Sequence, residues 1–143
     1  MASFNFRLHS VHELRRHIEN EYKDTHEAEN QKLRELLNLG SKLLSEHKHW
    51  SQQYIKIASE GMSPTQAIRL GSYIEELLRQ IRENELQIEN QAEVVEKARL
   101  ELIEKMKERK TLDKLYEKQY AEFTASDLLK TEKEIEDLIK IRL

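Results

Sequence analysis

Six histidines and 27 acidic side chains are the groups in this sequence best suited to bind a metal or to move a proton near neutral pH. His9 and His12 are three residues apart with Glu13 beside them, so the three could share one face of a helix. A closed metal site needs three or four converging ligands, and this pattern supports one only weakly. His47 and His49 would point to different faces. We therefore expect no metal ion and no cofactor.

The sequence contains no motif typical of nucleophilic catalysis or of phosphate binding. There is no cysteine, and the glycines at positions 40, 61 and 71 are too far apart to form a phosphate-binding loop. The serines occur in helical or capping contexts rather than at a strand-to-helix nucleophile turn. The carboxylates are distributed along what we expect to be solvated helix faces. We predict a protein that is not an enzyme.

Composition favours long helices over a compact globule. Charged residues make up 36% of the chain and hydrophobic residues 38%, with one Pro and three Gly. The net charge of −3 argues against a dedicated nucleic-acid binder. No apolar stretch approaches the roughly 20 residues that a bilayer-spanning helix needs, so we expect no membrane insertion.

A seven-residue repeat determines how the side chains must be arranged. The repeat holds apolar or aromatic residues at eight of nine positions and predicts a coiled-coil seam. Its positions are Ala67, Ile74, Ile81, Ile88, Val95, Leu102, Arg109, Tyr116 and Phe123. A matching repeat precedes it at Leu36, Leu43, Trp50 and Ile57.

One break separates the two repeats. Gly61 suits the residue that follows a helix, Ser63 suits an N-cap, Pro64 suits the first helical position, and Gln66 completes a capping box. The sequence therefore predicts an all-α fold in which two long helices form an antiparallel coiled-coil hairpin, with Leu43 of the first helix near Ile81 of the second. We expect one domain over residues 1–143, with a helix at about 5–59, a turn at 60–63 and a helix at about 64–141. The capping side chains at 124–127 indicate a kink or a fresh helix start.

The last residues of the second helix and three polar residues in the seam each allow more than one interpretation. Residues beyond about Phe123 would have no partner in the first helix, so they fold back, bind something or fray. Asn84 and Gln91 fall at companion seam positions, where polar residues fix register at a cost in stability. Arg109 interrupts the main repeat, and either its side chain extends out to solvent or a third element packs there.

Aromatic residues gather at two places in the predicted hairpin. Trp50 and Tyr54 would lie opposite Tyr73, and a two-stranded seam is too narrow to bury all of them together with Ile74. An exposed aromatic patch there would serve as a docking site, whereas the alternative is that Trp50 simply fills the seam. A second group forms at the other end from Phe4, Phe6, Tyr120 and Phe123.

The order of these parts resembles the FliJ family of the flagellar type III export apparatus. The opening Phe4-x-Phe6-Arg7-Leu8, the Gly61-Met62-Ser63 turn, the aromatic at Tyr73 and the late 114–120 stretch Lys-x-x-Glu-Lys-Gln-Tyr are similar to family members. The likeness covers nearly the whole chain. It implies a stalk that binds the hexameric flagellar export ATPase, contacts the cytoplasmic part of the export gate membrane protein, and escorts export chaperones.

The resemblance also implies where the partners bind. It assigns gate binding to Trp50, Tyr54, Tyr73 and Leu77. It assigns ATPase binding to Leu8, Val11, Tyr116, Tyr120 and Phe123. Asn84, His47 and Gln80 depart from the residues that relatives carry at the edge of the gate patch. The implied location is cytoplasmic, at the inner face of the membrane at the flagellar base, and we expect a monomer.

Three other interpretations stay open at this point. The chain could be the equivalent rod of a virulence-type injectisome or a rotary-ATPase stalk subunit. It could also be a prefoldin-like structural coiled coil. Prefoldin hairpins clasp clients with their tips and form multimers, whereas the aromatic residues here lie back from the tip and the two arms are unequal.

Overall fold

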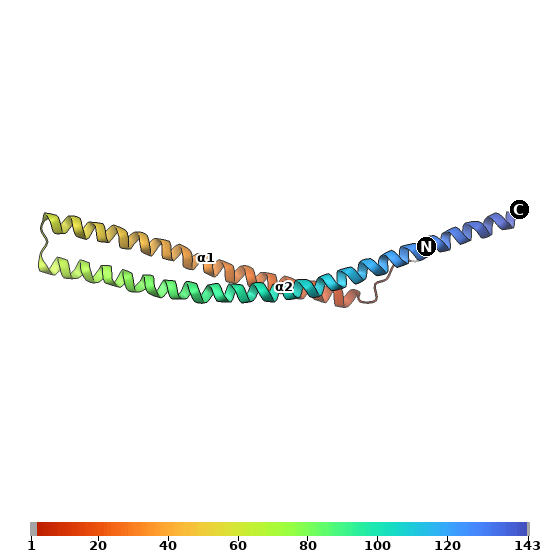
Figure 1. The fold of residues 1–143 in the computed structure, drawn as a ribbon, viewed down its shortest axis with the longest axis horizontal. Helices are drawn as coiled ribbons and strands as arrows, with labels where there is room; N and C mark the ends of the chain where they lie inside the picture. The colour runs from red at the N-terminus through yellow and green to blue at the C-terminus, as the bar shows by residue number, and fades with distance from the viewer. Residues whose placement is uncertain (1–2, 143) are drawn as a thin grey trace. The chain divides into compact units, whose positions relative to one another are not determined.

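The computed structural model describes residues 3–142 and contains two long helices (Figure 1). Helix α1 spans His9–Glu60 and helix α2 spans Pro64–Arg142. The two helices pack against each other as a helical hairpin, and the described residues include no strand. The predicted all-α hairpin is thus confirmed. No helix among the described residues is both long enough and apolar enough to cross a bilayer.

The turn between the helices has the predicted capping chemistry. Gly61 has a φ of 106°, the left-handed region that favours glycine, and its N–H reaches the Ala58 carbonyl at 3.4 Å. The Gln66 N–H donates to Ser63 Oγ at 3.2 Å, and the Ser63 N–H donates to Gln66 Oε1 at 3.2 Å. This reciprocal pair is a capping box, and it starts α2 at Pro64.

Two helix boundaries differ from the sequence expectation. Helix α1 begins at His9 rather than near residue 5, and the His9 N–H donates to the Phe6 carbonyl at 3.0 Å. Helix α2 continues without interruption through 124–127, so no fresh start occurs there. Thr124 does not cap a helix, because its hydroxyl donates back to the Tyr120 carbonyl at 2.9 Å.

The chain divides into two compact units, which are described separately. The turn unit is Asp24–Leu100, and the terminal unit combines Met1–Lys23 with Glu101–Leu143. In the turn unit, Leu43 of α1 packs with Leu77 and Ile81 of α2, and Trp50 packs against this cluster. Leu77 is the most buried of them, at 2% exposure. These contacts confirm that Leu43 and Ile81 meet across the hairpin.

Polar side chains interrupt the seam of the turn unit, as the heptad positions of Asn84 and Gln91 in the sequence predict. Asn84 is 4% exposed, and its amide donates to the Leu36 carbonyl at 3.0 Å. Gln91 donates to the Glu29 carbonyl at 2.9 Å and to the Glu29 carboxylate at 2.7 Å. The hydrogen bond from Gln91, with a further one from Lys32, lowers the pKa of Glu29. Each seam amide therefore has a specific partner in α1.

In the terminal unit, the last part of α2 carries uncovered apolar side chains. These residues are between 51% and 80% exposed: Leu128, Leu129, Ile135, Leu138, Ile139 and Ile141. Since α2 stays helical to Arg142, the segment does not fold back.

Candidate binding surfaces

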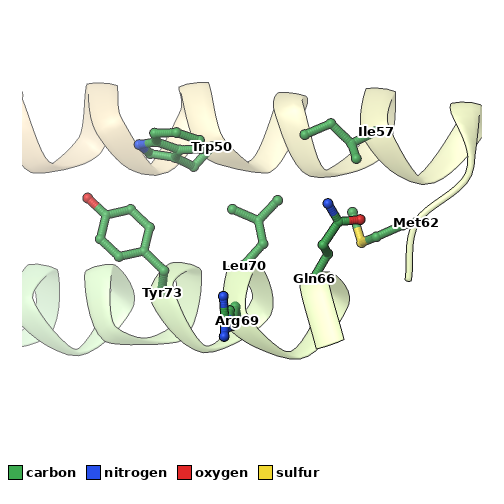
Figure 2. A pocket seen from close by; sticks show the side chains of 7 residues that line it. All are labelled: Trp50, Ile57, Met62, Gln66, Arg69, Leu70 and Tyr73. Carbon is green, nitrogen blue, oxygen red and sulfur yellow. The ribbon is translucent and has the colours of Figure 1, made fainter. Parts of the chain in front are cut away.

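The first candidate surface is an apolar groove of the turn unit, beside the turn. Trp50 of α1 meets Tyr73 of α2 edge to face, with ring centroids 5.8 Å apart. Figure 2 shows Leu70 and Tyr73 rising from α2 toward α1, with Met62 between the helices next to the turn. The groove has a volume of about 460 Å³. Its lining consists of Trp50, Ile57, Met62, Gln66, Arg69, Leu70 and Tyr73.

The four residues expected to bind the export gate have different environments. Tyr73 is 43% exposed, and Trp50 is half-buried beside it. Tyr54 is also half-buried, but it lines a different groove of about 390 Å³ with Ile55 and Ile74. Leu77 is 2% exposed and packs with Leu43 and Ile81. The structure thus joins Trp50 with Tyr73, sets Tyr54 apart, and makes Leu77 a support beneath the surface.

Trp50 has a seam contact as well as accessible aromatic area around it, and its docking role stays a prediction. Trp50 contacts the seam cluster, as a residue at a heptad position should. Aromatic area nevertheless remains accessible, because Trp50, Tyr54 and Ile74 are all only half-buried and Tyr73 is exposed. The expected docking set did not include Ile57, Met62, Leu70 and Arg69 of the groove. Of these, Leu70 could have been found from its three-residue spacing to Tyr73.

The second candidate surface is an aromatic cluster in the terminal unit. The Phe4 ring lies 5.5 Å from Tyr116, 5.3 Å from Tyr120 and 5.4 Å from Phe123. Phe6 is 5% exposed and meets Tyr116 edge to face at 5.3 Å. The predicted gathering of aromatic residues at this end is confirmed. It also explains the late start of α1, because Phe4 and Phe6 leave the helical path to reach α2.

The five residues expected to bind the ATPase all lie in this unit. Tyr116 is 37% exposed and Tyr120 49%, while Phe123 is half-buried against Phe4. Val11 is 41% exposed, and it lines a shallow groove with Leu112 of α2. Leu8 is half-buried just before α1. The cluster therefore leaves the two tyrosines and Val11 accessible to a partner.

A charged network lies next to the aromatic cluster. His12 is 5% exposed, and its Nε2 donates to Asp113 Oδ1 at 2.5 Å. Arg109 pairs with Glu19 of α1, Nε to Oε2 at 2.5 Å, and also with Asp113. The Arg109 side chain therefore neither extends out to solvent nor meets a third element, since an acidic residue of α1 receives it. Burial raises the pKa of Asp113, but the hydrogen bonds from His12 and Arg109 outweigh burial and hold that pKa below its usual value.

The histidines do not assemble a metal site. His12 faces Asp113, while His9 pairs with Glu13 at 3.2 Å on the surface. Within residues 3–142 no group of three His, Asp or Glu side chains could hold a metal ion. What the geometry offers is two surfaces with partly exposed aromatic side chains, each held in position by its own neighbours.

Comparison with known proteins matches the chain to a protein family. Residues 4–138 match the family model described as flagellar FliJ protein. No curated protein and no solved structure matches the chain.

Proposed function

The chain belongs to the flagellar FliJ protein family, and we propose that it binds the flagellar export ATPase through its terminal unit and the export gate through its turn unit. Membership makes the chain a component of the flagellar export apparatus. In this proposal it acts as a non-enzymatic monomer at the cytoplasmic side of the flagellar base. The family likeness extends the proposal to the escort of export chaperones. The flagellar match favours this function over an injectisome rod, a rotary-ATPase stalk or a prefoldin-like protein.

The observation that supports the proposal is the presence of pre-positioned, partly exposed aromatic side chains in each unit. Tyr73 is fixed by Trp50, and Tyr120 is fixed by Phe4 and Tyr116. Aromatic residues dominate binding energy at protein interfaces, and a side chain that is already held loses little conformational entropy on binding. In the proposal, the gate contacts the groove of the turn unit, and the ATPase contacts the tyrosines of the terminal unit.

Under this proposal, the chain would change ATP hydrolysis by binding one conformation of the ATPase better than the others. A protein without catalytic groups can change the activity of an enzyme only by binding one of its states better than another. We therefore expect the chain to raise ATP hydrolysis by its cognate export ATPase by favouring the assembled, active ring. Tyr120→Ala should reduce this stimulation, because Tyr120 is exposed and its removal leaves the Phe6–Tyr116 contact in place.

The test of the gate assignment uses Tyr73→Ala. Trp50 packs against the seam cluster, so changing it risks the fold, whereas Tyr73 is 43% exposed. We expect Tyr73→Ala to weaken binding to the purified cytoplasmic part of the cognate gate about tenfold, while stimulation of the ATPase is retained. Ile68→Ala is the matched control, because Ile68 is 69% exposed in the same unit and does not line the groove. Equal gate affinity of Tyr73→Ala and wild type, measured by calorimetry, would contradict the assignment.

A further inference from the structure

Four lysines lie in a row on one face of α2 in the terminal unit. They are Lys107, Lys110, Lys114 and Lys118, and all four are exposed. At about 100° per residue their directions fall within about 80° of arc, and at about 1.5 Å per residue the row is about 16 Å long. No carboxylate of residues 3–142 forms an ion pair with any of them. We call this set the lysine row.

The lysine row faces away from α1. On the opposite side of the same helix turns, Arg109 pairs with Glu19, Asp113 with His12, and Tyr116 contacts Phe6. Glu108 is likewise turned aside, and pairs with Arg15 at 2.8 Å. The intramolecular contacts therefore take up the nearby acidic groups and leave the lysines to solvent. Glu117, at the edge of the row, forms no ion pair with them among the described residues.

The segment that carries the lysine row has a positive net charge, whereas the chain as a whole has a negative one. Residues 107–118 contain five basic and three acidic side chains, a net charge of +2, whereas the whole chain carries −3. The remainder of the chain therefore carries −5. Such a positive segment attracts an acidic surface over the distance at which salt does not screen it, about 10 Å at 0.1 M ionic strength.

We propose that the lysine row binds a narrow row of carboxylates on the protein partner of the terminal unit, which under the proposed function is the export ATPase. One lysine per helical turn matches acidic side chains spaced at a similar interval along a helix of the partner. The row is one residue wide and is flanked by Glu104, Glu117 and Glu122, which a broad anionic surface would also meet.

A lipid surface fits the row less well. A helix that lies on a membrane inserts an apolar face beneath its basic side chains. In the helical turns that carry the row, the apolar side of α2 is occupied by Phe4 and Phe6, through their contacts with Tyr116 and Tyr120. Nucleic acid is disfavoured as well, because a nucleic-acid binder usually carries a basic excess overall and stacking aromatics within its basic face.

The experiment compares two quadruple Lys→Gln variants with equal loss of charge. One changes the lysine row, and the other changes Lys42, Lys48, Lys56 and Lys97, which are exposed in the turn unit. We expect the row variant to bind the purified cognate export ATPase about tenfold more weakly at 50 mM NaCl, with a shallower dependence of affinity on salt. The control variant should bind as wild type does, and circular dichroism should show that both variants keep their helices.

The remaining outcomes separate this inference from the function on which it rests. Wild-type chain that fails to bind the ATPase would overturn both. Wild-type binding that the row variant matches in affinity and salt dependence would overturn the lysine row alone. So would a loss confined to vesicles of phosphatidylcholine and phosphatidylglycerol, with ATPase binding unchanged, because it would identify the row as a lipid-binding surface.

Discussion

The turn unit and the terminal unit hold the same two helices together by different chemistry. In the turn unit, Leu77 is 2% exposed and packs with Leu43 and Ile81, and the polar interruptions are the amides of Asn84 and Gln91. In the terminal unit, the contacts between residues far apart in sequence come from aromatic rings around Phe4 and from an ionic network around Asp113. Seam amides keep the same charge at every ordinary pH, whereas the ionic network does not.

This difference matters under the proposed function, in which each unit binds its own partner. Buried amides with fixed partners specify register, since any shift of one helix along the other leaves them unpaired. An ionic network loses its contribution when one member changes protonation state. We therefore expect the turn unit to keep its register over a wide pH range and the terminal unit to respond to acid.

Of the substitutions that test this comparison, Leu77→Ala should change the free energy of unfolding most. The substitution opens a cavity in the best-packed part of the turn unit and should lower the free energy of unfolding by about 3 kcal/mol. Hydrogen exchange should show faster opening in residues 24–100 than in the described part of the terminal unit. Leu86→Ala is the control, because Leu86 is 58% exposed and its truncation leaves no cavity. Equal loss from both substitutions would show that Leu77 does not anchor the seam.

The sequence was sufficient to predict the turn-unit seam for a physical reason. Heptad spacing and capping residues are local patterns, so Leu43 and Ile81 could be paired across the turn, and Ser63 and Gln66 could be assigned as a capping box. The polar character of position 84 was also visible. Its acceptor, the Leu36 carbonyl, was not, because every residue of a helix presents a carbonyl.

The terminal unit was harder to predict, because its contacts join residues far apart in the chain. His12 and Asp113 are separated by 101 positions, and no spacing rule selects that pair from the other histidines and carboxylates. Arg109 was recognised only as a break in a repeat. Its partner Glu19 could have been sought by asking which acidic residue the hairpin places opposite. The partner of either surface could not be predicted from contacts within the chain, because those contacts carry no information about a second protein.

A smaller effect, specific to the terminal unit, is expected from Asp113→Ala. The substitution leaves the buried His12 without its acceptor and removes one partner of Arg109, at a cost of about 2 kcal/mol at neutral pH. Asp137→Ala, an exposed change in the same unit, should cost almost nothing.

The pH dependence of that cost follows from the lowered pKa of Asp113. A carboxyl whose pKa is lower folded than unfolded stabilises the fold above its unfolded pKa, near 3.9, and that stabilisation is lost as pH falls through the folded pKa. The difference between wild type and Asp113→Ala should therefore shrink below about pH 4. Urea unfolding from pH 7 to pH 2.5 measures it, and a difference that stays constant over this range would exclude an ionised Asp113 as its source.

The smallest effect should come from Gly40→Ala, and its sign should depend on Asn84. A Cβ at position 40 would lie 2.7 Å from Asn84 Oδ1, so the buried amide would have to shift from the Leu36 carbonyl. We expect a loss of about 1 kcal/mol in the wild-type background. In an Asn84→Ala background the obstacle is gone, and the same substitution should stabilise α1 by about 0.5–1 kcal/mol through helix propensity.

Gly71→Ala is the matched control for that cycle, because a Cβ at position 71 would meet nothing within 4 Å. It should stabilise α2 by about 0.5–1 kcal/mol in both backgrounds. Thermal unfolding of the single and double variants gives the coupling between positions 40 and 84 directly. If Gly40→Ala stabilised the wild type as much as Gly71→Ala does, the amide of Asn84 would be free to move, and the idea that buried amides fix the register of the turn unit would fail at its most closely packed position.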